Sequence, residues 1–166
     1  MNDSTARLDL PLLAAGQAQK EIWHNEALAL IDLAVAPAVL AIGVDAPPAA
    51  PLPGQAWVVG AVPRDAWVGR AGSVAGWTEG GWRFVRPFEG LSIWVVAEKL
   101  HASFVDGRWM LGDIRARQIL VDGMRVLGSR RPAIPGPTGG ASADAEARAT
   151  LDQVLETLRE HGLIAR

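Results

Sequence analysis

The apolar residues of this chain repeat with two different periods, and a proline-rich stretch at residues 45–53 separates the two regions. From residue 16 to about residue 41 the apolar positions recur every three or four residues, which predicts a helix. Beyond Glu26 this segment is apolar nearly all round, so the helix needs cover from its own sheet or from a neighbouring subunit. Pro37 is expected to kink or end it, because proline interrupts the helical hydrogen bonds.

Residues 54–127 change to a period of two and contain three short turn signals between aromatic or aliphatic runs. This pattern predicts a small antiparallel β-domain built from hairpins. The expected turns are Gly80-Gly81, Asp106-Gly107 and Asp122-Gly123.

A second connector rich in proline and glycine covers residues 129–141, and a last helix is predicted from about residue 142 to residue 161. Ser142 is placed to cap this helix, and Gly162 to end it. Four apolar residues along it form a seam of about two heptads, which is too short for a free-standing coiled coil. The seam consists of Ala147, Leu151, Val154 and Leu158.

The expected fold class is therefore α+β, with an N-terminal helix, a small antiparallel β-domain with hairpins, and a C-terminal helix for oligomerisation. We divide the chain into a helical attachment and oligomerisation segment (1–44), the β-domain (54–128), a Pro/Gly linker (129–141) and the C-terminal helix (142–166). Because neither helix can bury its apolar side alone, we expect a closed homo-oligomer, most simply a trimer or a pentamer. The expected oligomer or attachment contacts are Gln17, Gln19, Lys20, Asn25, Leu28, Leu151, Val154 and Leu158.

The composition argues against several classes of protein. A formal net charge of −2 gives no electrostatic footprint for binding nucleic acid. The chain has no cysteine and only three histidines, so thiolate and multi-histidine metal sites are not expected. No nucleophile elbow or phosphate-binding loop is present, and we expect neither an enzyme nor a cofactor. The sequence also predicts no signal peptide and no membrane-spanning segment.

The aromatic residues are unevenly distributed, with seven Trp, three Phe and no Tyr. Trp77, Trp82 and Trp109 flank predicted turns, where an exposed indole could stack on a sugar ring. Burial in the core or at a subunit contact is the favoured interpretation even for these three. Trp57 and Trp94 lie within strand-like apolar runs and are expected in the core, whereas Trp67 is left open.

The N-terminal segment contains the string GQAQKE at residues 16–21, followed by NEAL at residues 25–28. With this string as its most specific part, the chain resembles a phage-like protein family of alphaproteobacterial prophages and gene transfer agents that is catalogued as a domain of unknown function. The other similar segments are residues 10–15, 82–85, 87, 89–90, 94–95, 128, 130, 132–134, 139–140, 144–148 and 158–164.

The resemblance implies a virion component, because this family is associated with head spikes that engage host capsular polysaccharide. It carries no catalytic residues, and this chain has no room for the distal receptor-binding part of longer spike or fibre proteins. We therefore expect the base of a head spike or a short spike. It would be attached to the capsid or to another spike or fibre protein, made in the cytoplasm and released by lysis. The alternatives are a free-standing carbohydrate-binding module that uses the turn-flanking Trp residues and, less favoured, a glycan-degrading enzyme.

Overall fold

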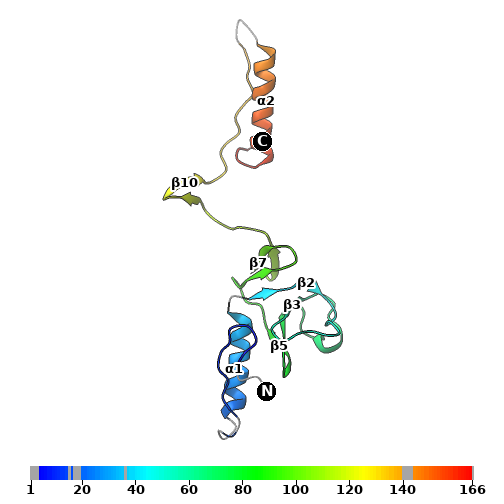
Figure 1. Cartoon of the computed structure of the whole chain (residues 1–166). Coiled ribbons are helices and arrows are strands. Elements are labelled where there is room, and N and C mark those ends of the chain that lie inside the picture. Colours follow the sequence, from blue (N-terminus) through cyan, green and yellow to red (C-terminus); the bar gives the residue numbers. More distant parts are fainter. Residues whose placement is uncertain (1–3, 15, 17–19, 36, 140–143, 166) are drawn as a thin grey trace. The chain divides into compact units, whose positions relative to one another are not determined.

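The computed structural model describes residues 4–14, 16, 20–35, 37–139 and 144–165. The chain divides into two compact units, Met1–Asp113 and Ile114–Arg166, and each is described by itself. Both contain sheet and helix, so the expected α+β fold class is confirmed. Figure 1 shows the elements of each unit along the chain.

The first helix, α1 (Lys20–Ala34), is shorter than the sequence predicts. The prediction that helix continues to about residue 41 is wrong, because residues 38–44 form two short strands, β1 (Ala38–Val39) and β2 (Ile42–Val44). Proline at position 37 cannot donate a helical hydrogen bond, and its carbonyl instead accepts one from the backbone N–H of Trp94 at 2.9 Å. The apolar run that suggested more helix therefore serves as strand.

Two sheets form the body of the first unit, with strand orders β1-β6-β7-β8 and β2-β3-β4-β5. Strands within residues 56–111 pair antiparallel with one another, as expected, whereas β1 pairs with β6 and β2 with β3 in parallel. The remaining strands are β3 (Ala56–Val59), β4 (Val74–Thr78), β5 (Gly81–Val85), β6 (Ser92–Val95), β7 (Leu100–Val105) and β8 (Arg108–Leu111).

The three predicted hairpins are confirmed as β4–β5, β7–β8 and a hairpin in the second unit. In β4–β5 the turn lies at Glu79-Gly80, one residue earlier than expected, because Thr78 pairs with Gly81. Asp106 and Gly107 both have positive φ (52° and 75°), as two-residue hairpin turns require.

The first unit has two hydrophobic clusters. The larger joins residues of both sheets with Leu33 of α1, and includes the fully buried Val39, Ile93 and Val95. The smaller contains Trp57, Trp67, Val59 and Ala75, with Trp82 packed against it. Trp67 lies on a 3₁₀ turn, Asp65–Trp67, and is completely buried.

The second unit contains a hairpin, β9 (Ile119–Val121) with β10 (Met124–Leu127), and the helix α2 (Ala145–Glu160). The carboxylate of Asp144 caps α2 by accepting a hydrogen bond from the Ala147 N–H at 2.9 Å. The prediction that Ser142 caps the helix falls on a residue outside the described ones. The predicted stop is confirmed, since the helix ends before Gly162, which has φ +70°.

The proline-rich connector is fastened along α2 within this unit. Arg159 donates a hydrogen bond from Nη2 to the Ile134 carbonyl (2.8 Å), and Arg148 from Nη1 to the Pro137 carbonyl (3.2 Å). Arg131 forms a parallel bridge with Ile164, and Ile164 is buried together with Leu155. Residues 131–139 were expected to form a plain linker, but they lie along the helix, and we call this segment the strap.

Candidate functional site

A cleft of about 310 Å³ opens in the first unit between the N-terminal segment, α1 and the β4–β5 hairpin. Its volume is at the lower end of the roughly 300–1,000 Å³ typical of small-molecule pockets. Apolar residues such as Ile22 and Leu33 line part of it, and Asn25, Glu26 and Arg83 bring polar groups.

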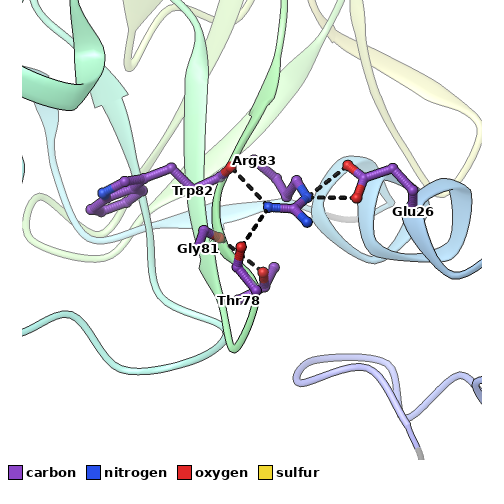
Figure 2. A network of polar contacts seen from close by, with 6 residues as sticks. Glu26, Thr78, Gly81, Trp82 and Arg83 are labelled. Carbon is purple, nitrogen blue, oxygen red and sulfur yellow. Dashed lines mark hydrogen bonds and ion pairs between the residues drawn. The ribbon is translucent and has the colours of Figure 1, made fainter. Parts of the chain in front are cut away.

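An ion pair between α1 and the hairpin forms one wall of the cleft (Figure 2). Arg83 Nε lies 2.6 Å from Glu26 Oε1 and 2.8 Å from Oε2. The Nη1 atom of Arg83 also donates hydrogen bonds, each 3.1 Å long, to the carbonyls of Gly80 and Trp82. One guanidinium thereby fixes the hairpin tip and ties it to the helix.

A buried aspartate on α1 holds the N-terminal segment at the other wall. Asp32 Oδ1 accepts hydrogen bonds from the Thr5 hydroxyl (2.8 Å) and the Leu8 N–H (2.6 Å), and Oδ2 accepts one from the Arg7 N–H (3.2 Å). Arg7 Nη1 donates to the carbonyls of Asp32 and Leu33 near the end of α1, where such carbonyls lack helical partners.

The polar groups of the cleft therefore hold parts of this chain together. The Asn25 side chain donates to the Leu13 carbonyl (3.0 Å) and accepts from the Leu13 N–H (2.9 Å). It was predicted as an attachment contact, and in the structure it fastens the N-terminal segment to α1. Within the described part of the chain, no group of three or more His, Asp or Glu residues could hold a metal ion.

The three Trp residues proposed for glycan or interface contact are all half-buried and packed against other rings or the backbone. Gly76 faces Leu33, so strand alternation places Trp77 on the opposite face of its sheet, where it pairs with Trp82. The Trp82 ring lies 5.1 Å from that of Trp67 in an edge-on contact. Trp109 donates a hydrogen bond from Nε1 to the Gly72 carbonyl at 2.9 Å. This arrangement favours the packing interpretation.

Of the two Trp residues expected in the core, one is there and one is not. Trp57 is buried, whereas Trp94 is 37% exposed. The prediction for Trp94 is wrong because the register of β6 turns Ile93 and Val95 inward and leaves Ser92 and Trp94 on the outer face. The alternation of side chains along a strand shows that Trp94 faces away from Ile93 and Val95. It does not show which of the two faces is buried, because both carry apolar residues.

The remaining predicted contacts differ in exposure. Lys20, Leu151 and Val154 are exposed, and Leu28 and Leu158 are half-buried. Gln17 and Gln19 lie outside the described residues. The sequence reasoning missed Trp23 on α1, which is 81% exposed and lies at helical spacing from the exposed Ala27 and Ile31. The single chain thus leaves this side of α1 uncovered, whereas the sequence predicted only that the segment beyond Glu26 needs cover from its own sheet or from a neighbouring subunit.

The hairpin of the second unit has an apolar face whose four side chains are all exposed to solvent in part. Val121 pairs with Met124, and Ile119 with Leu127, so these four side chains share one side of the two strands. In the described residues, β9 and β10 pair only with each other.

The cleft and the two sheets define the first unit as a small α+β domain braced by polar contacts between its helix and its hairpin. The family model described as "Protein of unknown function (DUF2793)" matches residues 24–110, which is more than half of the chain. The chain belongs to this family. No curated protein matches it. Neither described helix has the length and apolar character needed to cross a membrane.

Proposed function

We propose that this chain is a structural attachment protein of a phage-like particle, the base of a head spike or a short spike on the capsid surface. In this proposal it acts as a closed homo-oligomer, a trimer or a pentamer, and supports adhesion to the surface polysaccharide of the host. It is synthesised in the cytoplasm and reaches the outside by lysis with the particle. It has no catalytic role.

The exposed apolar face of the β9–β10 hairpin is the observation that supports the homo-oligomer, whereas the particle role rests on the resemblance to the phage-like family. An isolated two-stranded hairpin is at best marginally stable in water, and more strands or a packed face are needed to hold it. Ile119, Val121, Met124 and Leu127 are each more than 40% exposed in the single chain. Copies of the same chain around a symmetry axis would supply the missing cover.

The helix of the second unit supports the same conclusion. One side of the helix, which faces the strap, carries Arg148, Leu155 and Arg159. The side with Leu151, Val154 and Leu158 carries no charged residue, because helical spacing places Asp152 and Glu156 elsewhere around the axis. Thr150 and Thr157 lie on that second side, and their hydroxyls already donate to the carbonyls of Glu146 and Gln153, each at 2.9 Å. An uncharged helix side with satisfied hydroxyls is suited to packing against another helix.

Light scattering coupled to size-exclusion chromatography tests the oligomer. The proposal expects about three or about five times the chain mass of 17.6 kDa. The double change Leu151→Asp and Val154→Asp should shift the mass towards one chain. Glu156→Ala, on a charged and exposed part of the same helix, is the matched control and should leave the mass unchanged. A wild-type mass of one chain at micromolar concentration contradicts the proposal.

The particle role is tested separately. Removal of the gene should leave intact heads that no longer attach to host cells, and the protein should copurify with capsids. Imaging of whole particles should place the extra density at the capsid surface in multiples of three or five. A protein that never copurifies with particles yet binds glycans alone would instead be the free carbohydrate-binding module.

A further inference from the structure

The second unit has two apolar surfaces that stay uncovered in the single chain. One lies on the β9–β10 hairpin, and we call it the hairpin face; it consists of Ile119, Val121, Met124 and Leu127. The other is a shallow groove on α2, and we call it the α2 groove; it is lined by Thr150, Gln153, Val154, Thr157 and Leu158. Because both surfaces are open at once, the hairpin of a chain does not fill the groove of the same chain.

The two surfaces lie in segments of opposite charge. Residues 114–131, which contain the hairpin, hold five arginines and one aspartate and have a formal charge of +4. Residues 144–160, which contain α2, hold five acids and two arginines and have a formal charge of −3. The two helix arginines, Arg148 and Arg159, already donate to carbonyls of the strap. A positive hairpin and a negative helix are complementary partners.

Acidic side chains border the α2 groove. Gln153 lines the groove, and helical spacing places Glu146 seven residues before it and Glu160 seven residues after it on the same side of the helix. Both glutamates are exposed, and neither carboxylate forms a hydrogen bond or an ion pair within the described residues. The rim of the groove therefore offers two unpaired negative charges to a partner.

Arginines border the hairpin face in turn. Ile119 pairs with Leu127, so the residues before β9 and those after β10 start from the same end of the hairpin. Four of the five arginines lie in these two flanking stretches, within four residues of the hairpin face, and all four are exposed: Arg115, Arg117, Arg130 and Arg131. An apolar face bordered by positive charge fits an apolar groove bordered by negative charge.

Symmetry and charge together select which surface covers which. A closed trimer or pentamer has no two-fold axis, so each contact between neighbouring copies joins two different patches. Packing hairpin on hairpin would bring two segments of charge +4 together, and packing helix on helix would bring two of charge −3 together. Like charges at an interface are unfavourable. Hairpin on helix is the combination that joins opposite charges.

We propose that the hairpin face of one copy docks into the α2 groove of the next copy around the ring. Met124, the most exposed residue of the hairpin face at 73%, packs against Val154, and the flanking arginines meet the acids at the rim. Each copy gives one hairpin and receives one, so a closed ring leaves neither surface uncovered. This inference rests on the proposed homo-oligomer and names the contact that builds it.

Two variants that each remove one surface test the contact by complementation. Met124→Asp removes the hairpin face and keeps the groove, and Val154→Asp does the reverse. In light scattering each variant alone should have a mass near one chain, because the ring needs both surfaces. An equal mixture at high micromolar concentration should give a heterodimer of about twice the chain mass of 17.6 kDa and nothing larger, since only one intact contact can form.

Ala145→Asp is the matched control, because it introduces the same charge on the side of α2 away from Val154, and it should keep the wild-type mass. If Met124→Asp alone stays oligomeric, helices pack on helices. If Val154→Asp alone stays oligomeric, hairpins pack on hairpins. Either result overturns the assignment, and so does a mixture without heterodimer.

Chemical crosslinking gives a second test that leaves both surfaces in place. The chain has no cysteine, so Met124→Cys and Val154→Cys introduce single thiols at two exposed positions. A short bis-maleimide should link the double variant into a ladder that ends at three or five chains, and should leave each single variant unlinked. Dimers of a single variant would indicate like-on-like packing. A link within one chain would mean that the hairpin covers its own helix, and both results contradict the proposal.

This inference and the proposed function can fail separately. A wild-type oligomer that gives neither the heterodimer nor the ladder keeps the proposed function and rejects this contact. A wild-type mass of one chain rejects the oligomer and the contact with it. Copurification with particles depends on neither measurement, so it reports on the particle role alone.

Discussion

Gly76 on β4 lies directly against Leu33 of α1, so closely that a Cβ atom at position 76 would be 2.7 Å from Leu33 Cδ1 and 2.9 Å from Cδ2. Leu33 is buried in the larger hydrophobic cluster, and the missing side chain at Gly76 is what allows the helix to approach the sheet. The packing of α1 in the first unit therefore depends on this glycine.

Gly76→Ala should destabilise the protein by about 1–3 kcal/mol, because the added methyl group overpacks a filled core. Urea denaturation monitored by Trp fluorescence measures the loss. Gly80→Ala is the comparison and should cost less, since a Cβ there would meet the partly exposed Arg83 guanidinium at 3.2 Å rather than a buried side chain. Leu33→Ala removes the clash, so the double variant should lose less stability than the sum of the losses of the two single variants. Strict additivity would show that the contact does not limit the packing.

Asp32→Asn should cost about 2–4 kcal/mol and release the N-terminal segment. The carboxylate accepts hydrogen bonds from Thr5, Arg7 and Leu8. In the variant an amide NH₂ group replaces one of the accepting oxygens, so at least one of these donors loses its acceptor. Faster proteolytic cleavage within residues 4–14 is the local readout, beside the denaturation midpoint. Glu79→Gln, an exposed acid at the hairpin turn, should change neither. Unaltered cleavage in Asp32→Asn would argue against this role.

The local parts of this fold could be predicted from sequence, and the long-range parts could not. Turn residues determine their own hairpins, because Asp-Gly pairs adopt the positive φ values that the turn needs wherever the strands then go. Pro37 was expected to kink or end α1, but the strands after it were not predicted because residues 38–44 are apolar on every side. Such a segment is compatible with a buried strand as well as with a buried helix. Its pairing with β6 and β3, which the sequence does not reveal, makes it strand.

The same limit applies to the candidate site. Glu26 and Arg83 are 57 residues apart, and nothing in either neighbourhood indicates that they meet. Trp94 was assigned to the core because hydrophobicity alone does not reveal which residues of an apolar run face outward. The need of α1 for cover beyond Glu26, in contrast, followed from composition, since that requires only a count of polar positions along one helix.

The two residues of the Glu26–Arg83 ion pair should contribute unequally to the stability of the protein. Both side chains are partly exposed, so Glu26→Gln should cost no more than about 1 kcal/mol, and the cost should shrink in high salt. Arg83→Ala should cost more, about 1–2 kcal/mol, because it also removes the hydrogen bonds to Gly80 and Trp82. Denaturation of both single variants and the double variant gives the coupling. Equal costs for the two single changes would refute the additional role of Arg83.

Leu155→Ala and Leu151→Ala should separate the folding of the second unit from its assembly. Leu155 is buried on the strap side of α2, whereas Leu151 is 52% exposed in the single chain. Loss of Leu155 should free the strap and raise hydrogen exchange of the α2 amides by at least tenfold, because burial of an apolar side chain holds the two segments together. Leu151→Ala should leave amide exchange of a dilute, dissociated sample near wild type and weaken the oligomer. If instead both changes accelerated exchange equally in that dissociated sample, the helix would have no separate assembly side, and its exposed seam would serve only the fold of one chain.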